Sequence, residues 1–112
     1  MTNDRTANDL THIVQRLATE RGGRLFRNNT GRLKTESGRW VQFGVPPKGG
    51  SDLIGWMPGA RFTAVEIKVG RDKLSDEQGS FLAAVIKAGG VAGVVRTVED
   101  AEALLSAPAP SA

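Results

Sequence analysis

The sequence predicts an α/β fold of the α+β kind, in which a mixed β-sheet is flanked by helices. Two stretches carry apolar residues at the three- and four-residue spacing of one helical face, and short β-prone runs bounded by glycine and proline lie between and after them. The order helix, strand, hairpin, helix, strand, helix then requires a sheet with helices packed on it. Because 112 residues are too few for two independent cores, we expect one domain over residues 1–105.

In the first half of the chain, residues 8–21 form the first predicted helix, which ends at Gly22 and Gly23. Residues 24–27 alternate polar and apolar side chains and predict a short strand before the turn-forming residues 28–31. Residues 32–38 lack periodicity and predict a loop. Residues 40–44 predict a second short strand, because they are β-prone and end before two prolines.

In the second half, residues 52–56 and 62–69 predict a hairpin, because Pro58 and Gly59 lie between them as turn residues. Ser75 and Gln78 have the spacing of a capping box and begin a helix that ends at Gly89. Residues 91–96 predict a buried strand, and Thr97 can cap a last short helix. The tail, residues 106–112, is rich in proline and alanine and is expected to be disordered.

The composition restricts the chemistry that the chain can carry out. It has no cysteine and one histidine, so thiolate chemistry and zinc-thiolate sites are excluded, and any metal must be held by oxygen. No apolar run approaches the roughly 18 residues of a membrane span, and the first twenty residues lack the apolar block of a signal peptide. We therefore expect a cytoplasmic protein without a membrane partner.

Positive charge is concentrated in the first half of the chain. The formal net charge is only +3, but seven basic residues lie between Arg16 and Arg39 against Glu20 and Glu36. Such a block predicts binding to a polyanion such as nucleic acid. The alternative interpretation is an ordinary solvated surface.

The candidate chemistry lies in the second hairpin strand. Alternation places Glu66 and Lys68 on one face of that strand, where a carboxylate and an ammonium are costly to desolvate unless they are paired or serve a site. Asp52 lies fourteen positions earlier, so pairing across the hairpin can bring two carboxylates together. With the carbonyl of Ile67 as a third ligand, they suit Mg²⁺. The alternatives are an ion pair for Glu66 and Lys68, and a turn or cap role for Asp52.

A series of ordered motifs resembles a known family. The segments 50–52 (GSD), 65–68 (VEIK), 75–78 (SDEQ) and 88–91 (AGGV) are similar to the VRR-NUC domain of the PD-(D/E)xK nuclease superfamily, above all to its small stand-alone phage and prophage members. The resemblance implies a restriction-endonuclease-like αβββαβ core, dependence on Mg²⁺ or Mn²⁺, and cleavage of DNA. It further implies branched substrates such as four-way junctions or flaps, and a phage- or prophage-encoded protein in the cytoplasm of a bacterial host.

By this resemblance, Asp52 and Glu66 are metal ligands, and Lys68 positions the attacking water and offsets charge on the phosphate. Gln78 faces the site from the following helix, and its alternative role is the capping box. The family usually has a glutamate on the first helix. That region here offers Asp9 as the candidate ligand, whereas His12 is expected on the helix surface.

We expect DNA to be bound by basic and amide side chains in and around the first strand, although asparagine-rich turns also occur without a function. These candidates are Arg24, Arg27, Asn28, Asn29, Arg32, Lys34 and Lys48. A homodimer is expected, because symmetric cutting of a junction needs two active sites, and Trp40 and Trp56 are expected in the core or in the dimer contact. Two other functions stay open, a non-catalytic nucleic-acid-binding module with the same fold and a structural accessory protein.

Overall fold

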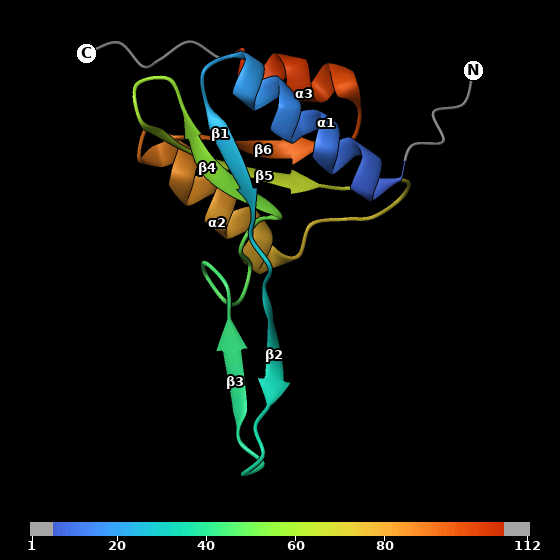
Figure 1. The fold of residues 1–112 in the computed structure, drawn as a ribbon, viewed down its shortest axis with the longest axis vertical. Coiled ribbons are helices and arrows are strands. Elements are labelled where there is room, and N and C mark those ends of the chain that lie inside the picture. Colours follow the sequence, from blue (N-terminus) through green and yellow to red (C-terminus); the bar gives the residue numbers. More distant parts are fainter. Residues whose placement is uncertain (1–5, 107–112) are drawn as a thin grey trace.

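The computed structural model describes residues 6–106, which form three helices, a four-stranded sheet and a separate two-stranded ribbon (Figure 1). In chain order the elements are α1 Ala7–Glu20, β1 Arg24–Arg27, β2 Gly31–Lys34, β3 Trp40–Phe43, β4 Leu53–Met57, β5 Arg61–Ile67, α2 Asp76–Lys87, β6 Val91–Val95 and α3 Val98–Leu105. The predicted disordered tail lies outside the described residues, apart from Ser106.

The main sheet has the strand order β1-β4-β5-β6. The pairs β1–β4 and β4–β5 are antiparallel, and β5–β6 is parallel, so the predicted mixed sheet and the predicted hairpin are both confirmed. The parallel pair requires a crossover connection, which α2 supplies. Helix α2 packs on β5 and β6 from one face, whereas α1 and α3 lie on the other (Figure 1).

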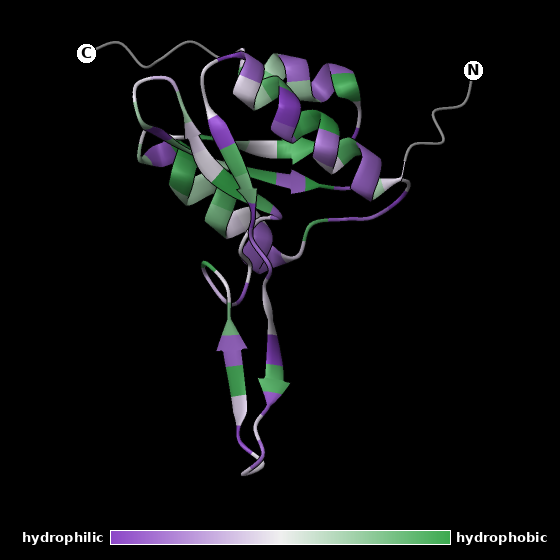
Figure 2. Ribbon diagram, viewed as in Figure 1, coloured by the Kyte–Doolittle hydropathy of each residue, from purple (hydrophilic) through white to green (hydrophobic). Residues whose placement is uncertain are grey.

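The core divides between the two faces of this sheet. Its larger part lies under α1 and α3, and its smaller part lies under α2 (Figure 2). Leu10, Val14, Leu53, Val65 and Val95 are each at most 1% exposed and belong to the larger part. The sheet is therefore packed between helices on both faces, and the acidic residues Asp52 and Glu66 lie where β4 begins and β5 ends.

All three helices begin with a capping box, in which a hydroxyl and a side chain three residues later satisfy each other's backbone amides. The predicted box at Ser75 and Gln78 and the predicted cap at Thr97 are therefore confirmed. In residues 6–106, no helix has both the length and the apolar character needed to cross a membrane.

The ribbon of β2 and β3 corrects the loop predicted for residues 32–38. Strand β2 covers residues 31–34, and the ribbon projects from the core as an arm (Figure 1). Its register places Arg32, Lys34, Trp40 and Gln42 on one face and Leu33, Val41 and Phe43 on the other. The short strand was missed because neither of its faces is buried in the core, so it lacks a hydrophobic pattern long enough to recognise.

Two smaller expectations also need correction. Strand β5 ends at Ile67, two residues earlier than predicted, so Lys68 lies just beyond its end. Trp40 and Trp56 are 57% and 45% exposed, and neither belongs to the core. A contact between two copies of the chain stays a prediction for both.

Candidate active site

Two carboxylates meet where β4 begins and β5 ends. The register pairs Leu53 with Val65, and continuing it by one residue places Asp52 opposite Glu66. Residues opposite each other in an antiparallel pair share a face, and their side chains lie close together. One oxygen of Asp52, Oδ2, accepts a hydrogen bond of 2.7 Å from the backbone amide of Ile67. The hairpin therefore brings the two acids together, as the sequence predicts.

Glu66 is almost completely enclosed, with only 2% of its surface exposed. Its Oε1 accepts a hydrogen bond of 3.2 Å from Nε2 of Gln78 and lies 3.9 Å from Nζ of Lys68. Its other oxygen, Oε2, is buried and receives no hydrogen bond from any residue in 6–106. A buried carboxylate oxygen without a partner is costly, so this arrangement calls for a cation or a proton.

The electrostatics of Glu66 agree with that requirement. Burial, and after it the hydrogen bond to Asp52 and the negative charge of Asp52, together raise the pKa of Glu66 from 4.5 to about 8. The positive charge of Lys68 lowers it, but as the smallest of the four effects. In the protein alone, Lys68 therefore does not compensate the two neighbouring acids.

The residues present fit a hard divalent cation. Asp52 and Glu66 offer carboxylate oxygens, and no residue in 6–106 donates to Oε2 of Glu66. Ile67, whose amide donates to Asp52, would add its backbone carbonyl. Among residues 6–106, no three His, Cys, Asp or Glu side chains lie together in a way that could hold a metal ion. Mg²⁺ accepts such a sparse set, because it is usually held by one or two carboxylates and keeps waters that a substrate can replace.

Gln78 takes part in the capping box and also contacts Glu66, while its role in catalysis stays a prediction. Its side-chain Oε1 accepts the backbone amide of Ser75 at 2.9 Å, which closes the capping box, while its Nε2 donates to Glu66. The beginning of helix α2 is thereby connected directly to the acidic pair. Lys68 is also largely enclosed, with 16% of its side chain exposed, and its backbone amide donates to Val95 at 3.1 Å.

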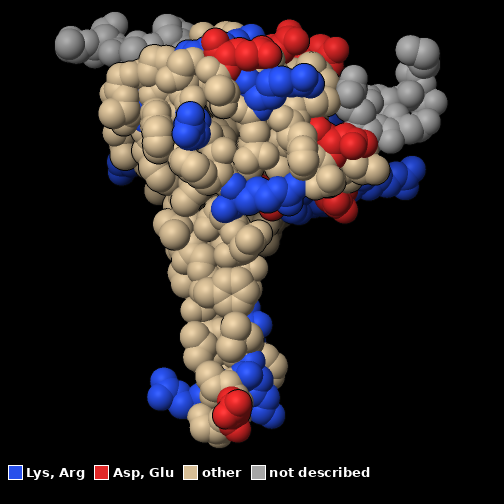
Figure 3. All heavy atoms as spheres, viewed as in Figure 1, with Lys and Arg blue, Asp and Glu red and all other residues tan. Residues whose placement is uncertain are grey.

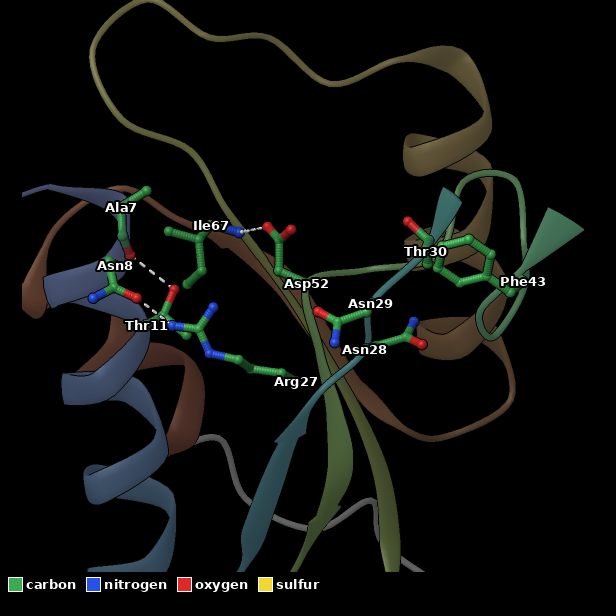
Figure 4. A pocket seen from close by; sticks show the side chains of 10 residues that line it. All are labelled: Ala7, Asn8, Thr11, Arg27, Asn28, Asn29, Thr30, Phe43, Asp52 and Ile67. Atoms are coloured by element: carbon green, nitrogen blue, oxygen red, sulfur yellow. Dashed lines mark hydrogen bonds between the residues drawn. The ribbon is translucent and has the colours of Figure 1, made fainter. Parts of the chain in front are cut away.

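Asp52 and Ile67 line a pocket of about 460 Å³ that lies between helix α1 and the root of the arm, where Thr30 and Phe43 line it (Figure 4). From α1 the pocket is lined by Ala7, Asn8 and Thr11, and Asn8 accepts a hydrogen bond from the guanidinium of Arg27. Asp9 does not line the pocket. Its carboxylate accepts the backbone amide of Thr6 in the helix cap, and its role as a metal ligand stays a prediction. His12 is exposed on the helix surface.

The predicted DNA-binding residues divide into three groups. Arg27, Asn28 and Asn29 line the pocket with Asp52. Asn28 is bound to the protein: its Nδ2 donates to the carbonyls of Val45 and Ser51 at 2.7 and 3.0 Å, and its Oδ1 accepts the amide of Val45 at 3.1 Å. The side chain of Asn28 therefore holds the segment that leads from β3 back to β4.

The second group lies on the arm and at its root. The guanidinium of Arg32 lies 4.4 Å from the ring centre of Trp40, and Nζ of Lys34 lies 6.0 Å from it. Lys48 shares a smaller hollow of about 250 Å³ with Arg32 and forms a 3.2 Å ion pair with Glu77. Basic side chains gather at the tip of the arm and across its junction with the core (Figure 3).

The third group is Arg24 alone, which pairs with Trp56 at the opposite end of β1 and does not line the pocket. Sequence reasoning missed five residues that line the pocket, namely Ala7, Asn8, Thr11, Thr30 and Phe43. None of them had a signal in the sequence. A small residue in the first turn of a helix and an aromatic residue in a short strand are both commonplace, and only the fold places them on two sides of one pocket.

Comparison with known families agrees with this geometry. The sequence profile of the VRR-NUC domain matches residues 4–99, which is most of the chain. No protein of curated function matches the chain.

Proposed function

This chain belongs to the VRR-NUC domain family, and on that premise we propose that it is a magnesium-dependent DNA endonuclease that cleaves branched DNA. Manganese would serve the same role. The family membership and the nuclease-type fold support a phosphodiesterase, and the proposal adds the metal, the catalytic residues and the substrate.

One observation carries the proposal: Oε2 of Glu66 is buried, receives no hydrogen bond from the part of the chain that the structure describes, and belongs to the residue opposite Asp52. If Glu66 and Lys68 were only a structural ion pair, the ammonium would satisfy the carboxylate. The ammonium instead lies 3.9 Å away, against the oxygen that Gln78 already contacts. A structure without a metal function gains nothing from enclosing this acid beside a second one.

Each residue then has a defined role. Asp52, Glu66 and the carbonyl of Ile67 would hold the metal, which when bound acidifies an attacking water and stabilises the charge that develops on the phosphate. Gln78 orients Glu66 through its hydrogen bond. Lys68 offsets negative charge on the phosphate at the same face. Asp9 remains the candidate for an additional ligand from α1.

DNA would be bound mainly through its phosphates. Arg27 and Asn29 are exposed in the pocket beside Asp52, and Arg32 and Lys34 extend the positive charge along the arm. Such contacts position a nucleic acid without identifying its bases. Selection by DNA shape, and therefore action on branched substrates, is proposed from the family resemblance, and these phosphate contacts add affinity without reading a sequence.

We also propose a homodimer, so that two active sites act on one junction. An exposed aromatic row of Phe26, Trp56 and Phe62 crosses β1, β4 and β5, on the part of the sheet that α2 leaves uncovered. These rings are 43–49% exposed, so at roughly 200 Å² each they leave about 270 Å² of apolar surface per copy. That area suits the apolar centre of a two-fold contact. Light scattering of the wild type and of Trp56→Ser tests it.

The main test is a panel of plasmid, flap, splayed and four-way DNA substrates, with and without Mg²⁺. Asp52→Asn and Lys68→Ala should each abolish cleavage, while the controls Glu20→Gln and Lys87→Ala, on exposed helix positions, should cleave normally. Calorimetry should show that Asp52→Asn loses Mg²⁺ binding and that Lys68→Ala largely keeps it. DNA binding without metal should survive in both.

Two outcomes would contradict the proposal. Cleavage by Asp52→Asn at the wild-type rate, in a folded protein free of contaminating nuclease, would remove the metal assignment. A wild-type protein that binds branched DNA but cleaves nothing in Mg²⁺ or Mn²⁺ would instead support the non-catalytic binding module.

A further inference from the structure

We propose that Phe43 is a stacking platform for an unpaired base beside the scissile phosphate, so that the pocket accepts a nucleotide from a single-stranded or branched segment. This inference rests on the proposed function and names the feature of DNA that the site selects. It starts from an aromatic side chain that the core does not use, since Phe43 belongs to neither core cluster and is 40% exposed.

Phe43 is the last residue of β3 and lines the same pocket as Asp52 and Arg27. In Figure 4, Asp52 and Asn29 lie between helix α1 with Arg27 on one side and Phe43 with Thr30 on the other. The pocket therefore presents a cation and an amide near the acidic residues and an aromatic ring at its opposite end. A nucleotide has a matching arrangement, with a phosphate at one end and a planar base at the other.

The ring is held at this position by two glycines. Gly31 pairs with Phe43 across the ribbon, and a Cβ at Gly31 would lie 3.0 Å from Cζ of the ring. The following residue, Gly44, has a φ of 114°, and a Cβ there would lie 2.5 Å from the side chain of Thr30. Both strands thus approach closely at the root of the arm, which directs the ring to the pocket instead of to the core.

The size of the pocket decides between paired and unpaired bases. Its volume of about 460 Å³ suits a ligand the size of one nucleotide and is far too small for a base pair with its neighbours. A base within a duplex is stacked on both sides and cannot present a face to a protein ring. An unpaired base can do so, and stacking on aromatic side chains is how proteins commonly bind single strands.

The test measures affinity in EDTA, so that it does not depend on cleavage. The probes are a four-way junction carrying one unpaired nucleotide at the branch point and a continuous duplex of equal length. Phe43→Ala should bind the junction roughly ten-fold more weakly and the duplex unchanged, and Phe43→Trp should restore junction binding. The control Ile86→Ala, which removes an apolar side chain that is even more exposed, at 57%, on α2, should change neither.

Thermal melting confirms that each variant is folded before its affinity is compared. An equal loss on junction and duplex would overturn the proposal by showing that Phe43 only supports the arm, and so would junction affinity equal to that of the wild type. Because binding is read without metal, a protein that selects unpaired bases and cleaves nothing would refute the proposed nuclease and keep this inference. A protein that cleaves DNA but does not select unpaired bases would support the proposed nuclease and refute this inference.

Discussion

Replacing Glu66 with glutamine should stabilise the metal-free protein at neutral and alkaline pH. An amide has almost the shape of the protonated acid. It can accept the hydrogen bond that Gln78 donates to Oε1, and its NH₂ group can donate to Asp52 as the protonated carboxyl does. The substitution removes only the buried negative charge. Glu66, as the proposed metal ligand, should therefore destabilise the folded protein when no metal is bound.

The magnitude follows from the pKa. The ordinary pKa of a glutamate is 4.5, and in the folded protein burial, together with Asp52, raises the pKa of Glu66 to about 8. Between these two pH values the folded state binds more protons than the unfolded state. The contribution of Glu66 to the free energy of unfolding is therefore fully present below pH 4.5 and is lost as pH rises through 8. At about 1.4 kcal/mol per pKa unit, the loss at pH 7 has an upper limit of about 3 kcal/mol. Glu66→Gln should recover most of it.

The assay is denaturant unfolding in EDTA from pH 4.5 to 8.5, for wild type, Glu66→Gln and the exposed control Glu20→Gln. The stability curves of the wild type and of Glu66→Gln should meet at the acidic end and separate as pH rises, while the control follows the wild type. Adding Mg²⁺ should then stabilise the wild type, by about 2.7 kcal/mol at one hundred times its Kd, and leave Glu66→Gln nearly unchanged.

Two results would refute this reasoning. If Glu66→Gln were less stable than the wild type at pH 8 without metal, Glu66 would be a well-compensated structural ion-pair partner of Lys68. If wild-type stability did not fall between pH 5 and pH 8, the carboxylate would not be strained by its burial.

Three further predictions concern the arm and its root. Asn28→Ala should cost about 2–3 kcal/mol of unfolding free energy, because it removes three hydrogen bonds to the backbone worth about 1 kcal/mol each; denaturant unfolding measures this. Gly49→Ala should lower the melting temperature, because its φ is 84° and a Cβ would lie 2.8 Å from the backbone of α2, whereas Gly70→Ala adds a Cβ in open space and has only the strain of φ 60°. Replacing Arg32 and Lys34 with glutamine should weaken binding to all DNA shapes and reduce the salt slope by about two, measured by titration at several salt concentrations.

Much of the fold was predictable because its signals are local. The capping boxes, the glycines after α1 and α2, and the turn between β4 and β5 each depend on residues within a few positions of one another. The same holds for the acidic pair, since alternation along one strand and the register of one hairpin are enough to place Asp52 opposite Glu66. Short-range geometry therefore predicted the centre of the site.

The arm was not predictable in this way. Strand β2 has four residues, and neither of its faces is buried in the core. The residue that supports its pairing with β3 is Asn28, which lies outside both strands and hydrogen-bonds to Val45 and Ser51 after β3. Strand pairing without a buried face leaves only a weak trace in the residue pattern. The position of Phe43 at the pocket depends on this pairing, so it could not be predicted from the sequence either.

The sequence by itself determined which side chains share a strand face and which residues begin and end the helices, because strand and helix periods are properties of neighbouring residues. Only the tertiary structure decided that Glu66 is enclosed with one oxygen unpaired by any residue in 6–106, that Gln78 reaches it from α2, and that Asn8, and not Asp9, lines the pocket. Burial is set by what packs on a residue from elements far along the chain, and the cost of an unpaired carboxylate arises only after those elements have excluded water.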